Sequence, residues 1–153
     1  MLPRTVALAA ALLLLAPAPT ALAGLSRAEQ LLVRELNQVR AAHGLPPLRE
    51  DPHLQRAARA HSREMLATGV FRHGAFGTRL VEFDVRSRIA GENLAWGTGS
   101  LGAPAHIVAA WLASPEHRAN LLRPTFTRIG IGDLVGAFLG CRSAHVVTAD
   151  FAG

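Results

Sequence analysis

Apolar side chains recur at intervals of three and four residues in two long stretches of the chain, which predicts two amphipathic helices. The first begins at a capping box whose N-cap is Ser26 and continues to about Ala42. The second begins at Asp51, with Pro52 in its first turn, and ends at Gly69. Each helix would bury one apolar face against a common core.

The second half of the chain alternates between short helical patterns and extended ones. Helices are predicted at 78–89, 104–114 and 115–122, and strands at 92–96, 128–139 and 145–151. The last two strands are rich in aliphatic and β-branched residues and are separated by a turn at 140–143, which predicts a hairpin. Helices that flank a small, mostly C-terminal antiparallel sheet place the chain in the α+β class.

The first 23 residues have the pattern of a secretory signal. A cationic start at 1–4 is followed by an apolar run at 5–16 and by small residues before Ala23. The apolar run is shorter than the roughly 20 residues that a membrane-spanning helix needs, so no transmembrane anchor is expected. We therefore predict cleavage after Ala23, a secreted product and one domain at 24–153.

Composition narrows the function classes. Half of the residues are apolar and 18% are charged, which excludes a disordered chain. The net charge is +5 and every cation is Arg, but these residues are spread along the chain, which argues against nucleic-acid binding. A single cysteine, Cys141, excludes a disulfide scaffold and a cysteine-based zinc finger.

The segment 97–102 matches the glycine pattern GxGxxG. A dinucleotide site would also require a βαβ unit and an acidic residue after the next strand. No second parallel strand is predicted after this segment, so we interpret it as a connector.

Seven histidines are the unusual chemical feature of the sequence. They are His43, His53, His61, His73, His106, His117 and His145. His61 lies on an apolar helical stripe and is expected to be a hydrogen-bonded core residue. His73 and His117 each lie at a break between elements, where binding groups concentrate. Glu92 begins a predicted buried strand and must find a partner. Spacing alone does not bring these three together, and structural hydrogen bonding remains open for each.

Several motifs, in order along the chain, resemble a known family. They are 36–40, 43–48, 57–65, 71–73, 91–95, 111–122, 129–132 and 146–151. In order and spacing they are similar to the CAP superfamily, named for cysteine-rich secretory proteins, antigen 5 and pathogenesis-related proteins, and above all to its short bacterial branch. The resemblance covers about residues 31–151, nearly all of the predicted mature chain.

The resemblance implies a three-layer α-β-α sandwich with a central cleft in which two His and two Glu can hold a divalent metal. His73 and His117 match the two histidines and Glu92 matches the first glutamate, as a ligand or as a carboxylate that orients an imidazole. Ser114 replaces the second glutamate, so the set is incomplete. Two imidazoles alone should bind Zn²⁺ with low affinity. This zinc binding should fail at about pH 5–6, as the imidazoles become protonated.

Two functions are consistent with these residues. The first is an exported, monomeric, non-enzymatic module that binds a small apolar or envelope ligand, or a protein partner, and no nucleic acid. The alternative is a metal-dependent hydrolase or peptidase with Glu92 as general base. A third possibility is that the remaining site residues only hold the helices to the sheet.

Overall fold

The computed structural model describes residues 24–153, so the predicted signal segment and its cleavage site lie outside the described residues. The helices are α1 (Arg27–Ala42), α2 (Pro52–Thr68), α3 (Phe76–Glu82), α4 (Pro104–Ala113) and α5 (Pro115–Leu121), with a short 3₁₀ helix η1 (Gly99–Gly102). The strands are β1 (Arg49–Glu50), β2 (Ala90–Gly97), β3 (Arg128–Phe138) and β4 (Cys141–Ala152).

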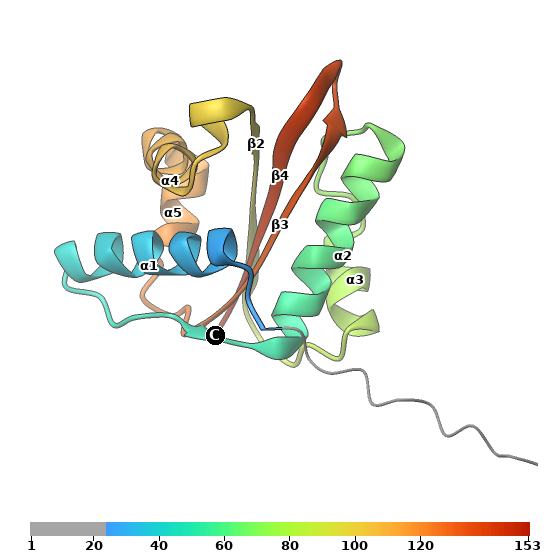
Figure 1. The fold of residues 1–153 in the computed structure, drawn as a ribbon. Coiled ribbons are helices and arrows are strands. Elements are labelled where there is room, and N and C mark those ends of the chain that lie inside the picture. The colour runs from blue at the N-terminus through green and yellow to red at the C-terminus, as the bar shows by residue number, and fades with distance from the viewer. Residues whose placement is uncertain (1–23) are drawn as a thin grey trace, which may run out of the picture.

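A single four-stranded sheet forms the middle layer, with the strand order β1-β3-β4-β2. Figure 1 shows α2 and α3 on one side of it and α1, α4 and α5 on the other. This arrangement confirms the α+β class and the sandwich that the resemblance implied. The sheet is not wholly antiparallel as predicted, because β1 pairs with β3 in parallel. Strand β1 has only two residues, which is too short for a periodic pattern to appear in the sequence. It is a strand only because it pairs with a distant segment of the chain.

The predicted helix starts are confirmed by their hydrogen bonds. The hydroxyl of Ser26 accepts from the backbone N–H of Glu29 at 3.2 Å, and the Glu29 carboxylate accepts from the N–H of Ser26 at 2.7 Å. At the start of α2, the carboxylate of Asp51 accepts from the N–H groups of His53 and Leu54.

Some details of the predicted elements differ in the structure. The helix expected at 78–89 lies at Phe76–Glu82, and Asp84 follows it in the left-handed region, with φ at 55°. The segment 97–102 contains η1. The last strand begins at Cys141, because the hairpin turns within Leu139 and Gly140 and pairs Phe138 with Cys141.

The main hydrophobic core lies between the sheet and the layer of α1, α4 and α5, where Trp111, Phe126 and Phe151 are fully buried. A second cluster lies beneath α2 around Met65 and Phe138, and the half-buried Cys141 packs against it. Residues 24–153 thus carry a core of their own and are expected to fold without the first 23 residues. Among the described residues, no helix is long and apolar enough to cross a membrane.

Candidate functional site

The first predicted site residue, His73, contacts the second, Glu92. His73 lies in the loop between α2 and α3 with 60% of its side chain exposed, whereas the Glu92 side chain on β2 is 2% exposed. Nδ1 of His73 donates to Oε1 of Glu92 at 2.8 Å. Arg79 of α3 donates from Nη2 to the other oxygen, Oε2. Both carboxylate oxygens are therefore occupied, and Glu92 fixes the orientation of the His73 ring.

A second carboxyl group lies behind Glu92. Asp150 is the register partner of Glu92 on β4, and it is fully buried. Its carboxyl group lies against the carboxyl group of Glu92, and Nη2 of Arg79 is 4.0 Å from its Oδ1. Burial, and then the negative charge of Glu92, raise the pKa of Asp150 well above its ordinary value. Burial also raises the pKa of Glu92 to about 7, although Arg79 opposes the shift.

This buried pair predicts how stability depends on pH. A carboxyl whose pKa is raised by folding favours the folded state below its unfolded pKa, and this contribution is lost as pH rises through the folded pKa. We expect the pair's contribution to the free energy of unfolding to fall between pH about 4.5 and about 7. Asp150→Asn, which keeps the shape of a protonated acid, should flatten that fall. Urea unfolding across this pH range measures it, and an equally steep fall in Asp150→Asn would contradict it.

His117, the other predicted metal ligand, lies in the first turn of α5. Its Nδ1 is 2.9 Å from the hydroxyl of Ser114, the residue that stands where the resemblance expects a glutamate. Burial, and then the positive charge of His73, lower the pKa of His117. The two imidazoles are thus close enough to interact electrostatically.

Asparagine side chains hold α5 against β2 at this point. The amide of Asn93 donates to the backbone carbonyl of His117 at 3.0 Å, and Asn120 donates to the carbonyl of Glu92 at 3.2 Å. Neither spacing nor propensity indicated these contacts. They fix the position of His117 relative to Glu92.

Three residues around Glu92 were not predicted as part of this site: His61, Arg79 and Asp150. His61 is a fully buried core histidine, as expected, and its Nε2 donates to the carbonyl of Arg72 at 2.8 Å, in the loop that carries His73. Burial, and then Arg79, lower the pKa of His61. Asp150 was detectable as a lone charge in the β-branched run 146–151, whereas nothing in the sequence marks Arg79.

Two further histidines have partners of a structural kind. Nδ1 of His145 lies 2.9 Å from the buried carboxylate of Asp133, and Nδ1 of His53 lies 2.9 Å from the carbonyl oxygen of Phe83. His53 is half-buried.

The donors available for a metal are two imidazole nitrogens. When Nδ1 of His73 donates to Glu92 and Nδ1 of His117 donates to Ser114, each ring keeps a lone pair on Nε2. Glu92 is already bound to Arg79, and Glu116 is exposed. In the described part of the chain, no group of three or more His, Cys, Asp or Glu is placed to hold a metal. The residues fit, at most, a weak site with two protein ligands.

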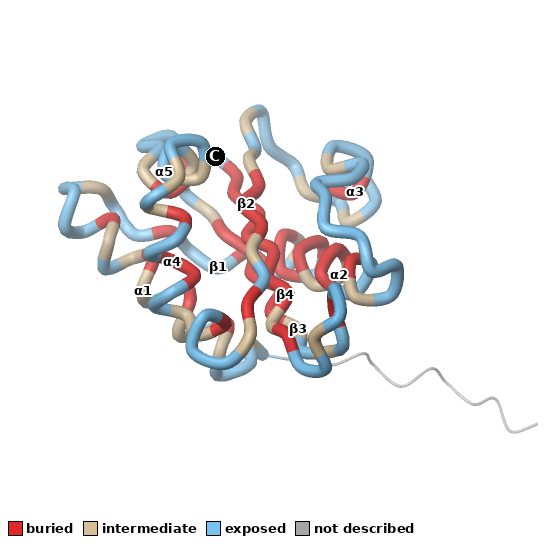
Figure 2. The backbone as a smooth tube through the Cα atoms, turned by 90° about the horizontal axis from the view of Figure 1, so that it is seen from above, coloured by how far each residue is buried: buried red, intermediate tan, exposed pale blue. Residues whose placement is uncertain are grey.

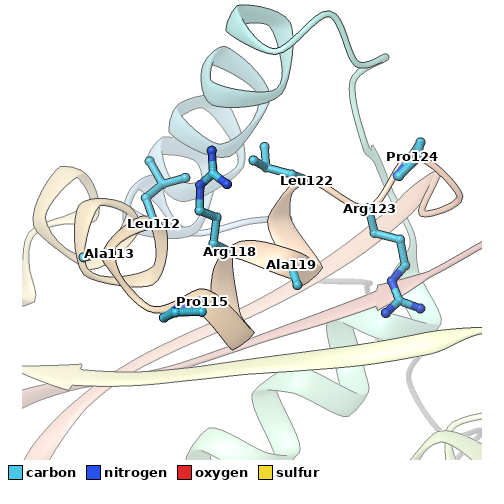
Figure 3. Close-up of a pocket in the computed structure, with 8 residues that line it drawn as sticks. All are labelled: Leu112, Ala113, Pro115, Arg118, Ala119, Leu122, Arg123 and Pro124. Carbon is cyan, nitrogen blue, oxygen red and sulfur yellow. The ribbon is translucent and has the colours of Figure 1, made fainter.

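A separate groove of about 560 Å³ lies on the outer side of α4 and α5 (Figure 3). It is lined by Leu112, Ala113, Pro115, Arg118, Ala119, Leu122, Arg123 and Pro124. Figure 3 shows the guanidinium of Arg118 extending toward Leu112 and Leu122, while Arg123 points to the opposite side. The groove therefore combines apolar walls with cationic groups, and helix α5 carries both this lining and His117.

Comparison with known proteins identifies the family. The model of the CAP, or cysteine-rich secretory protein, family matches residues 33–149, so the chain belongs to the CAP family. It is similar to the uncharacterized protein YkwD of Bacillus subtilis, with 37% identity over 109 residues that cover 68% of this chain and 41% of that protein. The chain thus spans less than half the length of this relative.

Solved structures show the same fold. An extracellular protein containing a SCP domain from Bacillus anthracis is 30% identical, with a TM-score of 0.66, over 81% of this chain and 39% of that one. An outer surface protein from Borrelia burgdorferi has a TM-score of 0.63 at 23% identity, over 81% of this chain and 92% of that one. The second likeness concerns the fold alone.

Proposed function

We propose that this chain is a secreted, monomeric, non-enzymatic binding module of the CAP family, with a weak divalent-metal site at His73 and His117. The observation that carries the proposal is the contact between His73 and Glu92, which orients the His73 imidazole, and the positive charge of this ring also lowers the pKa of His117. A buried carboxylate behind a metal-ligating histidine is the usual partner of such a ring. The extracellular description of the Bacillus anthracis relative supports secretion, and cleavage after Ala23 stays a prediction from the sequence.

The ligand class is a small apolar or envelope compound, or a protein partner. The groove on α4 and α5 supports a small ligand, because its volume lies in the range of small-molecule sites and its walls are mostly apolar. Arg118, whose guanidinium lies between Leu112 and Leu122, would favour a ligand that carries a negative charge.

Calorimetric titration of residues 24–153 with zinc tests the metal site. We expect weak binding that is lost in His73→Ala and in His117→Ala, and that weakens about tenfold in Glu92→Gln, because the His73 ring loses its orienting carboxylate. Burial already favours the neutral form of His117, so binding should fail only when acid protonates the pair.

His106→Ala is the matched control, since His106 is exposed on α4 and lies outside this cluster. It should bind zinc as the wild type does. Equal zinc binding by the wild type, His73→Ala and His117→Ala would rule out the site and leave these side chains a structural role.

A hydrolase or peptidase is the second candidate. The observation in its favour is the raised pKa of Glu92, about 7, which suits a general base near neutral pH. Against it, both Glu92 oxygens are bound by Arg79 and His73 in a buried position. A screen for hydrolysis with and without zinc separates the two functions, because metal-dependent turnover that is lost in Glu92→Gln would establish the enzyme.

A further inference from the structure

The large apolar side chains that remain exposed gather at one end of the molecule. Among the described residues, seven large hydrophobic residues are exposed, and all but Val81 lie at the end of the sheet where β2 and β3 finish and β4 begins. We call these six residues the apolar end. They are Val70 (44% exposed), Phe71 (40%), Trp96 (39%), Leu101 (65%), Val135 (56%) and Leu139 (51%).

Contacts between the loop after α2, the ends of strands β2 and β3, and η1 hold this end together. The Phe71 ring, after α2, and the Trp96 ring of β2 both pack edge-on against Phe138, with centroids 6.4 Å and 5.9 Å away. The backbone of Leu101 in η1 lies directly against Gly97. Figure 1 shows the β3–β4 hairpin projecting at the top of the molecule beside η1 and the end of α2, and Figure 2 shows from above that these loops are exposed.

The hairpin tip holds an unusual residue. Leu139 has φ at 46° and Gly140 has φ at 83°, so both central residues of the two-residue turn are left-handed. Such turns favour Asn, Asp or Gly at the first position, because a branched side chain is strained there. A strained and half-exposed leucine at the most projecting turn is unfavourable for folding and is a signal of a role outside the core.

The charge of these loops has one sign. The segments 66–75, 97–106 and 135–145 contain no Asp or Glu, and they contain Arg72 and Arg142. The carboxylate of Glu64 on α2 lies 3.9 Å from Arg72, in an exposed pair, while Arg142 is exposed and forms no hydrogen bond or ion pair with a described residue. The chain as a whole has a net charge of +5.

We infer that the apolar end docks on the surface of an anionic lipid bilayer. Exposed Trp, Phe and Leu side chains on loop tips can enter the headgroup region, where Trp is favoured, and flanking Arg side chains can pair with lipid phosphates. The contact needs neither the imidazole pair nor a metal, so it goes beyond the binding function proposed above. It would hold the secreted domain at an envelope surface without a transmembrane segment.

Binding to lipid vesicles in the presence of a metal chelator tests this inference. Residues 24–153 should sediment with phosphatidylcholine vesicles that contain one-third phosphatidylglycerol, less with pure phosphatidylcholine, and less in high salt. Emission from Trp96 should shift to the blue on binding, because Trp111 is already buried and provides a constant background.

Leu139→Asn is the decisive variant, since Asn is suited to the left-handed turn and the fold should be kept or improved. It should weaken binding about tenfold through the lost apolar contact, and Arg142→Gln should weaken it about fivefold. Val81→Ser, at the exposed position away from this end, should change nothing. Failure to bind anionic vesicles, or equal binding by Leu139→Asn, would overturn the inference. A dimer in sedimentation velocity that Leu139→Asn disperses, with no vesicle binding, would instead assign the surface to a second copy of the chain.

Discussion

Arg40→Met is expected to lower the free energy of unfolding by about 4 kcal/mol or more. Arg40 on α1 is fully buried, and its guanidinium donates only to backbone carbonyls. The acceptors are Pro46 at 3.0 Å, Leu121 at 2.8 Å, Arg123 at 3.1 Å and Phe126 at 3.1 Å. Methionine fills much of the volume but leaves these buried oxygens without donors, and each unsatisfied group costs about 1–3 kcal/mol.

Equilibrium denaturation in urea measures the effect, with Arg34→Met as the matched control on an exposed position of the same helix. Arg40→Lys should recover only part of the loss, because a single ammonium group cannot reproduce the planar set of donors. A change within about 1 kcal/mol for Arg40→Met, the size typical of an ordinary hydrogen bond, would contradict this account.

Gly130→Ala is expected to destabilise the fold by about 3 kcal/mol, the upper part of the usual range for overpacking. A Cβ atom at Gly130 on β3 would lie 2.1 Å from the carbonyl carbon of Leu54 and 2.2 Å from the backbone nitrogen of Gln55, both in α2. Backbone atoms of a helix cannot turn aside as a side chain can. The helix would have to move away from the sheet and lose the hydrogen bonds between Gln55 and the backbone of Ile131.

Gly136→Ala on the same strand is the matched control. Its Cβ would meet only the end of the Leu66 side chain, at 3.1 Å, and a rotation of that side chain can make room. Thermal and urea unfolding of the two variants should therefore differ clearly. Similar stabilities for Gly130→Ala and Gly136→Ala would contradict this account. They would show that Gly130 is not required for the close contact between α2 and β3.

Both positions also support the candidate site from a distance. Arg40 bonds to the carbonyls of Leu121 and Arg123 and so holds the end of α5, whose first turn carries His117. Gly130 lets α2 lie directly on β3, and α2 leads into the loop that carries His73. Loss of either contact would therefore disturb the distance between the two imidazoles as well as the stability.

Local chemistry made much of the fold predictable. The capping box at Ser26 and the Asp51 cap act within one helical turn, so their sequence neighbours are also their structural partners. The two amphipathic helices and the long hairpin strands follow from periodicity for the same reason. Strand β1 was missed because it exists only through pairing with β3, which is almost 80 residues away in register between Arg49 and Arg128.

The sequence by itself determined the two long helices, the three longer strands, the absence of a disulfide framework and, through the order of its motifs, the family. It also identified His73, His117 and Glu92 as candidates. Only the tertiary structure decided that His73 and Glu92 are in contact and that Arg79 and Asp150 lie beside the buried Glu92 carboxylate. It also decided that most of the exposed apolar residues lie at one end of the molecule. The reason is physical: these groups come from loops and strands far apart in the chain, and their proximity depends on how whole layers pack.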